Sequence, residues 1–152
     1  MTTLKEIQDF LGPKKMAFAG ASRNPKKFGG TILAELTKRG YELYPVHPEA
    51  MEINGIRCYR TIAGLPDGVD HLLIATRKSQ TTDLVKQALE RGMRMIWIQQ
   101  QSDTPEALEM AKNKGIPVIS GRCIFMFTEP VNGPHAFHRW LSKLFGSYPK
   151  KG

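Results

Sequence analysis

The stretch MAFAGASRNPKKFGG, residues 16–30, decides the fold of this chain. Residues 16–19 form a short apolar run without alternation, as expected of a strand that is buried on both faces. The run stops at Gly20, and after a basic segment Gly29-Gly30 leads into an amphipathic helix expected over residues 31–39. The order strand, glycine turn, helix is typical of the first unit of an α/β domain, where such folds bind phosphate.

The turn after this strand has the features of an anion site. Glycine lets the backbone turn sharply, and the N-terminus of a helix offers unpaired N–H groups and partial positive charge. The expected phosphate-binding residues are Gly20, Ala21, Ser22, Arg23, Lys26, Lys27 and Gly29. On this hypothesis, valine in place of Gly20 would block the approach of phosphate to the backbone. A plain tight turn with solvated basic residues is the alternative.

Composition sets the broad class of the protein. The chain has 152 residues, of which 41% are hydrophobic and 24% charged, as in an ordinary globular domain. No apolar run approaches the roughly 20 residues that span a bilayer, so we expect a cytoplasmic protein without a membrane partner. Cys58 and Cys123 are too few for a disulfide framework and are taken as reduced thiols.

The charge balance points to an anionic partner. The net charge is +8 and the isoelectric point is near 9.7. Nucleic acid, an acidic membrane surface and a phosphorylated small molecule all fit this charge. Charge alone does not choose among them.

Strands and helices alternate along the rest of the chain. A capping box at Thr3–Glu6 predicts a first helix that ends at Gly12-Pro13. Further strands are expected at residues 41–46, 71–75, 95–98 and 117–119, with a short one at 56–59, and helices at 80–91 and from about 105 to 115, with a helical turn at 61–65. This rhythm predicts an α/β, Rossmann-like doubly wound fold with a mainly parallel sheet and helices on both faces.

A C-terminal helical extension is expected beyond that domain. We place the domain at residues 1–124 and the extension at residues 125–152. Within residues 135–145, five apolar side chains form one stripe: Phe137, Trp140, Leu141, Leu144 and Phe145. This stripe predicts a helix docked on the same domain or on a second subunit in a homodimer, with a membrane-surface helix as the alternative. His135 and His138 have a spacing that permits two metal ligands, but no neighbouring ligand completes a site, so we expect no metal.

The usual dinucleotide fingerprint is missing. A nicotinamide-dependent dehydrogenase would show G-x-G-x-x-G at the first turn and an acidic residue at the end of the second strand. Here the turn is Gly20-Ala21-Ser22, and the second strand ends in Pro45-Val46-His47-Pro48. These residues disfavour NAD as the ligand.

Several motifs in this order resemble the small stand-alone CoA-binding proteins, whose fold is similar to the CoA-binding domain of the succinyl-CoA synthetase α subunit. The matching stretches lie between residues 14 and 124: GAS at 20–22 with its basic loop, PVHP at 45–48, LPDGVD at 65–70, IWIQQ at 96–100 and RCI at 122–124. The chain departs from the family pattern at His47, where asparagine is usual, and at Gln101, where glycine is common.

This resemblance implies a ligand and a set of contacts. Gly20, Ala21 and Ser22 would hold the diphosphate of coenzyme A, with Arg23, Lys26 and Lys27 near its phosphates. Pro45, Val46, His47 and Pro48 would lie against the adenine and ribose, and Arg77 and Lys78 would contact the ligand from the same edge of the sheet. For Cys123 two interpretations stay open, a thiol near the pantetheine end and a small buried core residue, and Cys58 raises the same choice.

The sequence therefore predicts a protein that binds coenzyme A or acyl-CoA without catalysis of its own. Ser22 has no G-x-S-x-G surroundings that would make it a nucleophile, and no catalytic residue is assigned. The alternatives are a nicotinamide-nucleotide-binding oxidoreductase, a fragment of an acyl-CoA synthetase, and a nucleic-acid binder or regulator. No helix-turn-helix or aromatic-basic RNA motif supports the last of these, so nucleic acid is not the expected partner.

Overall fold

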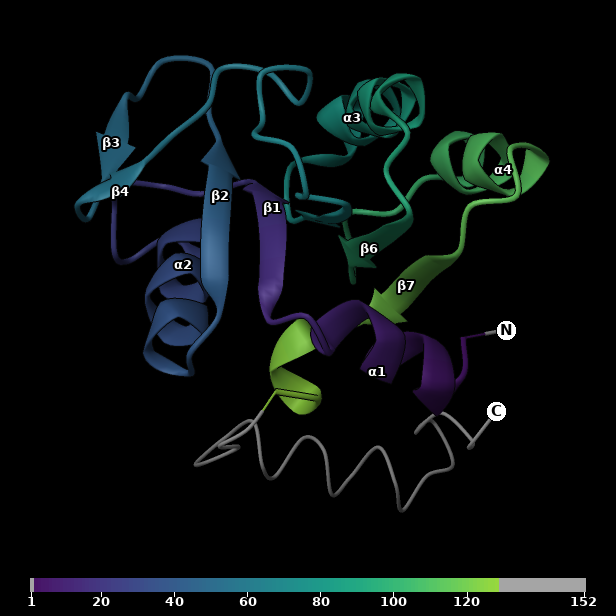
Figure 1. Cartoon of the computed structure of the whole chain (residues 1–152), viewed down its shortest axis with the longest axis horizontal. Helices are drawn as coiled ribbons and strands as arrows, with labels where there is room; N and C mark the ends of the chain where they lie inside the picture. Colours follow the sequence, from purple (N-terminus) through teal and green to yellow (C-terminus); the bar gives the residue numbers. More distant parts are fainter. Residues whose placement is uncertain (1, 129–152) are drawn as a thin grey trace.

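A sheet of five parallel strands forms the middle layer of the computed structural model, which describes residues 2–128 (Figure 1). Across the sheet the strands are β2 (Glu42–Val46), β1 (Lys15–Ala19), β5 (His71–Ile74), β6 (Met95–Gln99) and β7 (Val118–Arg122). The α/β, Rossmann-like doubly wound fold predicted from the alternation of strands and helices is confirmed.

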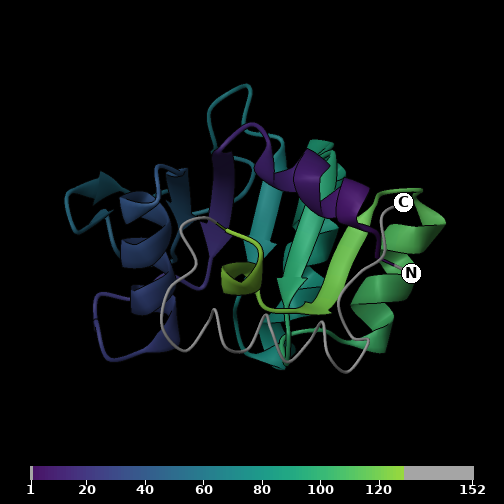
Figure 2. The same ribbon diagram turned by 90° about the horizontal axis from the view of Figure 1, so that it is seen from below.

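Helices cover both faces of this sheet (Figures 1 and 2). One face packs against α1 (Leu4–Leu11), α2 (Phe28–Lys38) and the short 3₁₀ helix η1 (Ile124–Met126). The other face packs against α3 (Lys78–Arg91) and α4 (Pro105–Asn113). None of the helices among the described residues is long and apolar enough to cross a bilayer.

Alternate residues of each central strand enter opposite halves of the core. In β1, Met16 and Phe18 belong to the cluster under α1 and α2, whereas Ala17 and Ala19 belong to the cluster under α3 and α4. Successive strand side chains point to opposite faces, so a strand covered on both sides needs apolar residues throughout. Residues 16–19 are therefore all apolar because both faces of β1 are buried.

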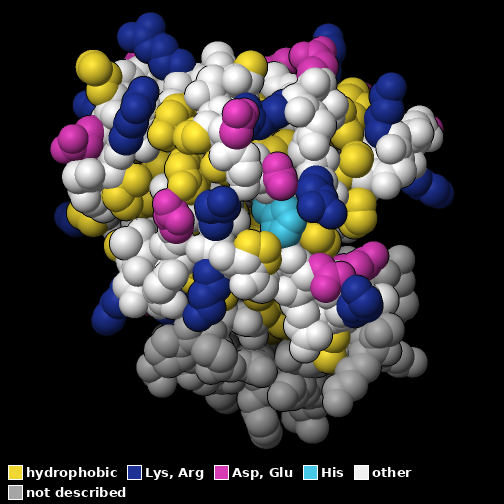
Figure 3. Space-filling model, in the orientation of Figure 1, with side chains coloured by type: hydrophobic (Ala, Val, Ile, Leu, Met, Phe, Trp, Pro, Cys, Tyr) yellow, Lys and Arg dark blue, Asp and Glu magenta, His cyan; other side chains and the backbone are white. Residues whose placement is uncertain are grey.

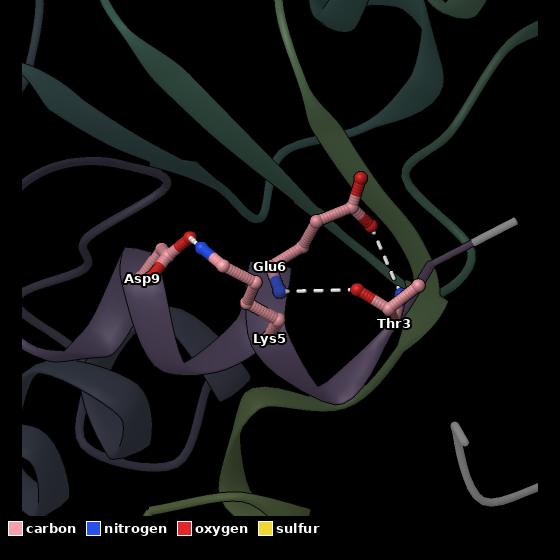
Figure 4. Close-up of polar contacts among 4 residues, drawn as sticks. All are labelled: Thr3, Lys5, Glu6 and Asp9. Atoms are coloured by element: carbon pink, nitrogen blue, oxygen red, sulfur yellow. Dashed lines mark hydrogen bonds and ion pairs between the residues drawn. The ribbon is translucent and has the colours of Figure 1, made fainter. Parts of the chain in front are cut away.

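The predicted capping box at the start of α1 is confirmed (Figure 4). The Glu6 N–H donates to Thr3 Oγ1 at 3.2 Å, and the Thr3 N–H donates to Glu6 Oε2 at 2.9 Å. Lys5 and Asp9 form an exposed ion pair one turn along, at 2.6 Å. The helix buries Phe10 against Trp97 of β6 and against the ring of His71.

Strand β2 lies at an edge of the sheet, and this position explains the proline in it. Pro45 has no N–H to donate, which only an edge strand tolerates. Beyond Pro45 the edge is closed by a single parallel bridge between Val46 and Tyr59. In that bridge the Tyr59 N–H donates to the Pro45 carbonyl and the His47 N–H donates to the Tyr59 carbonyl, both at 2.8 Å.

A small hairpin beside this edge was not predicted. Strands β3 (Glu52–Ile53) and β4 (Ile56–Arg57) pair in antiparallel fashion around Asn54-Gly55. Both turn residues have positive φ, 52° and 77°, as a two-residue turn of type I′ requires. The sequence had indicated the turn and a short strand at 56–59, which contains β4, but not β3 or the pairing of the two.

Two helices begin earlier than predicted. Helix α2 begins at Phe28 and not at residue 31, so Gly29 and Gly30 form its first turn. Helix α3 begins at Lys78 and not at residue 80. At 61–65, where a single helical turn was expected, the chain forms hydrogen-bonded turns that do not extend into a helix: the Gly64 N–H donates to the Thr61 carbonyl and the Leu65 N–H to the Ile62 carbonyl, both at 3.2 Å.

The end of the sheet also differs, since β7 runs on to Arg122 where a strand of three residues had been expected. After it, Ile124, Phe125 and Met126 are buried in the same cluster as α1 and α2. The expected helix at 135–145, its apolar stripe and the two histidines at 135 and 138 lie outside the described residues.

Candidate functional site

The strand order changes direction between β1 and β5. From β1 the chain crosses to β2 on one side, and it then returns to β5 on the other side of β1. Open α/β sheets bind ligands outside the carboxyl ends of the strands at such a switch point. The strands stay paired up to this edge, where the Ala75 N–H donates to the Ala19 carbonyl at 2.8 Å.

A cleft of about 700 Å³ opens at this edge, within the usual range for small-molecule sites. Nine residues expected from the sequence line it: Gly20, Ala21, Ser22, Lys27, Gly29, Val46, His47, Pro48 and Arg77. Five other expected residues do not line it: Arg23, Lys26, Pro45, Lys78 and Cys123. The structure adds residues that were not predicted: Ala19, Arg60, Ala75, Thr76, Ser79, Gln80, Asp83, Leu84 and Gln87.

The glycines of the turn are required by close contacts between backbone segments. Gly20 has φ +120°, and a Cβ there would lie 2.4 Å from the Ala75 carbonyl oxygen. A Cβ on Gly29 would lie 1.8 Å from the Gly20 carbonyl oxygen, and one on Gly30 would lie 2.4 Å from the Asn24 carbonyl oxygen. A side chain at Gly20 would therefore clash with the backbone of Ala75, directly after β5, before it could block phosphate, and the expectation needs this correction.

The loop between Gly20 and α2 is held by its own side chains. Ser22 Oγ accepts from the Asn24 N–H at 3.1 Å, and Asn24 Oδ1 accepts from the Lys26 N–H at 2.9 Å. The Lys27 N–H donates to the Asn24 carbonyl at 3.0 Å. These turns leave Lys27 at the N-cap of α2 in the cleft, while Arg23 and Lys26 are exposed outside it.

The two helices that begin at the cleft differ from the two that do not. Helices α1 and α4 have threonine caps, with Thr3 and Thr104 accepting from first-turn N–H groups. At α2 and α3 the cap residues are Lys27 and Arg77, and neither makes a side-chain capping bond. Both cleft helices therefore offer first-turn N–H groups and a cation to a negatively charged ligand.

The wall under α3 is braced by hydroxyl groups from the β6–α4 connection. Ser102 Oγ donates to the Thr76 carbonyl at 2.8 Å, and Thr81 Oγ1 donates to the Ser102 carbonyl at 2.6 Å. Thr81 and Ser102 are buried, so this link fixes the start of α3 against the end of β5. Arg91, at the other end of α3, donates to the carbonyls of Ile62, Ala63 and Pro66 and holds that loop beside the helix.

The opposite wall is the end of β2. His47 Nδ1 accepts from the Glu49 and Ala50 N–H groups, at 3.1 and 2.9 Å. An asparagine side chain makes the same local bonds with its Oδ1. The histidine that replaces the usual asparagine therefore keeps the turn and adds a second ring nitrogen. Pro45 is buried but lies one residue before the end of β2, and it does not line the cleft.

Both cysteines are buried thiols. Burial raises the pKa of Cys123, which outweighs the opposing effect of the Phe125 backbone N–H and the Gln99 side chain. Burial also raises the pKa of Cys58. Gln99 ties the segment after Cys123 to the sheet, because its Oε1 accepts from the Ile124 N–H at 3.1 Å. The surroundings of Cys123 are those of a packed core residue.

Most of the unpredicted cleft residues come from two segments. Thr76 and several residues of α3 follow β5. From this segment, the rule that ligands bind at the carboxyl ends of strands had identified Arg77 and Lys78 only, and of these two Arg77 lines the cleft. Arg60 follows a segment whose pairing with β2 had no sequence signal. Within residues 2–128, no group of three His, Cys, Asp or Glu side chains is placed to hold a metal ion.

A comparison with protein-family models matches residues 14–129 to a family described as "CoA binding domain". Among curated proteins, the chain is 30% identical over 129 residues to an ADP-forming acetate–CoA ligase of Archaeoglobus fulgidus. That match covers 77% of this chain but only 19% of the ligase. The uncharacterised protein YneT of Bacillus subtilis is 28% identical, and the match covers 78% of this chain and 89% of YneT.

Solved structures of small archaeal proteins have a similar fold. A conserved hypothetical protein from Pyrococcus furiosus superposes with a TM-score of 0.70 at 35% identity, covering 72% of this chain and 95% of that protein. A hypothetical protein from Pyrococcus horikoshii gives a TM-score of 0.73 at 27% identity, covering 82% of this chain and 92% of that one.

Proposed function

This chain belongs to the CoA-binding domain family, and from that membership we propose that it binds coenzyme A or an acyl-CoA in the cleft at the carboxyl ends of β1 and β5. The observation that carries the proposal is the pair of helices, α2 and α3, that begin at this cleft with a cation and without a side-chain cap. A diphosphate between them would accept hydrogen bonds from both first turns.

The proposed orientation follows from the chemistry of the walls. The diphosphate lies against the glycine turn, next to Lys27 and Arg77. The adenosine part extends toward the end of β2, where Val46 offers an apolar surface and His47 a polar one. No carboxylate stands at the end of β2 to bind ribose hydroxyls, which favours coenzyme A over NAD.

Binding without catalysis is part of the proposal. The cleft holds one carboxylate, Asp83, which accepts from Gln87 Nε2 at 2.7 Å, and one imidazole, whose Nδ1 is engaged by backbone N–H groups. Among the described residues that line the cleft, no side-chain hydrogen bond joins a nucleophile to a general base. The match covers only 19% of the Archaeoglobus fulgidus ligase, so the ligase activity in that protein's name is not carried over to this chain.

The charge of the molecule fits a small anionic ligand. Figure 3 shows Lys and Arg side chains spread over one face, with Asp and Glu side chains among them. A nucleic-acid surface needs clustered cations along the track of the backbone, and this face does not present one.

Two measurements test the proposed function. Mass spectrometry of the purified protein under native and denaturing conditions shows which small molecule co-purifies, and the expected mass difference is that of coenzyme A or a thioester of it. Calorimetric titration with coenzyme A and with NAD then ranks the two ligands. Tighter binding of NAD, or no binding of coenzyme A, would overturn the proposal.

A further inference from the structure

The end of β2 places a histidine and an arginine side by side. The parallel bridge pairs Val46 with Tyr59, so the next residues, His47 and Arg60, are neighbours across the two chain segments. Both line the cleft. This wall lies across the cleft from the start of α3, where Arg77 stands.

Within residues 2–128, the ring of His47 has one polar atom, Nε2, without a hydrogen-bond partner. Its Nδ1 accepts two backbone N–H groups and therefore carries no proton. The proton of the neutral ring is then on Nε2, because one ring nitrogen must donate when the other accepts. His47 thus brings an N–H donor to the cleft, which an asparagine with the same backbone bonds would not bring to that position.

Arg60 adds a positive charge beside this donor. Its side chain is exposed, and no hydrogen bond or ion pair joins it to another residue in the described part of the chain. It also lines a second cavity of about 640 Å³ between the β3–β4 hairpin and residues 58–64. Glu52 also lines that cavity, and in the hairpin register it is opposite another arginine, Arg57.

We propose that His47 and Arg60 form a second anion subsite, which takes the phosphate monoester on the ribose of the ligand. The inference rests on the proposed function, and it adds a specificity that the glycine turn does not supply. A ligand held by its diphosphate between α2 and α3 directs its ribose toward this wall. The 3′-phosphate of coenzyme A carries negative charge and three acceptor oxygens, which match a guanidinium and an Nε2–H donor. Dephospho-coenzyme A lacks this group and cannot use the subsite.

Calorimetric titrations of the full chain with coenzyme A and dephospho-coenzyme A test the subsite. The wild-type chain should bind coenzyme A at least tenfold more tightly, as expected for hydrogen bonds to a charged group. Arg60→Gln should weaken coenzyme A binding about tenfold and leave dephospho-coenzyme A binding unchanged. Arg57→Gln removes the same charge from the hairpin and serves as the matched control, because Arg57 does not line the cleft.

His47→Asn separates the ligand contact from the structural role of the ring. Asparagine Oδ1 can accept from the Glu49 and Ala50 N–H groups, so the melting temperature without ligand should stay unchanged. Affinity for coenzyme A should fall several-fold, and affinity for dephospho-coenzyme A should not. Equal affinity of the wild-type chain for the two ligands would overturn the subsite and leave the proposed function intact. Binding of neither ligand would overturn the proposed function itself.

Discussion

Gly29, in the first turn of α2, lies directly against the carbonyl group of Gly20 at the end of β1. A Cβ on Gly29 would stand 1.8 Å from that oxygen, far inside any allowed contact. The contact brings the start of the helix onto the turn that follows the strand. It thereby places the uncapped first turn of α2 at the floor of the cleft.

Replacing Gly29 by alanine should destabilise the fold. Alanine in a helix is ordinarily more favourable than glycine by about 0.5–1 kcal/mol. Here backbone atoms must move to admit the methyl group, and we expect a loss of about 1–3 kcal/mol, as for an overpacked core. Gly12→Ala is the control, because Gly12 already has helical φ and ψ of −54° and −43°. Urea unfolding of both variants measures the effect, and equal stability of the two would show that the contact does not constrain the chain.

Replacing Lys27 by asparagine should stabilise α2 and weaken ligand binding. Lys27 has the extended backbone of an N-cap but makes no capping bond. Asparagine there can accept from a first-turn N–H and add about 0.5–1 kcal/mol to the free energy of unfolding. The same bond uses a donor that the ligand needs and removes a charge, so affinity for coenzyme A should fall several-fold. Lys26→Asn, outside the cleft, should change neither quantity, and tighter ligand binding by the Lys27 variant would contradict the assignment.

Replacing Gln101 by glycine should stabilise the protein. Gln101 has φ +72°, a conformation that costs a residue with a side chain about 1–2 kcal/mol. Glycine adopts it freely but loses more entropy on folding, so we expect a net gain of about 0.5–1 kcal/mol. Gln100→Gly, at a position without positive φ, should lose stability instead. Thermal melting decides, and a lower melting temperature for the Gln101 variant would be evidence against this cause.

Stability should fall as the pH rises above about 9, in part through Cys123. Burial raises the pKa of this thiol above its ordinary value of 9.0, so the native state keeps the proton that the unfolded chain releases. The contribution is fully present below pH 9 and is lost as the pH rises toward the native pKa. Tyr44 stays protonated in this range, because its hydrogen bond to Glu42 raises its pKa to about 12.

Urea unfolding of Cys123→Ala between pH 8 and 10 tests this origin of the pH dependence. The variant should lose less stability per pH unit than the wild-type chain over the range in which Cys123 would titrate. Cys58 has a raised pKa as well, so some slope should remain in the variant. An identical slope in the two proteins would rule out Cys123 as a source.

Local geometry accounts for the residue types at the two positions where this chain departs from the family pattern. The glycine that is common in the family at position 101 suits the positive φ that Gln101 adopts here. The asparagine that is usual at position 47 suits the two N–H groups that His47 Nδ1 accepts. Both departures had been seen in the sequence, but their consequences needed the backbone angles and the bonds.

The sequence by itself determined the layers of the fold and the edge of the sheet that carries the site. Strands buried on both faces are apolar throughout, and helix ends have local signals such as the capping box at Thr3. Both signals can therefore be recognised in a few consecutive residues. The positions of Gly20, Lys27 and Arg77 at the cleft follow from that local order. Only the tertiary structure decided which other side chains share the cleft. Arg60 reaches it through a single bridge to β2, and Thr76 through the pairing of β5 with β1, and such contacts between distant segments leave no periodic trace in the sequence.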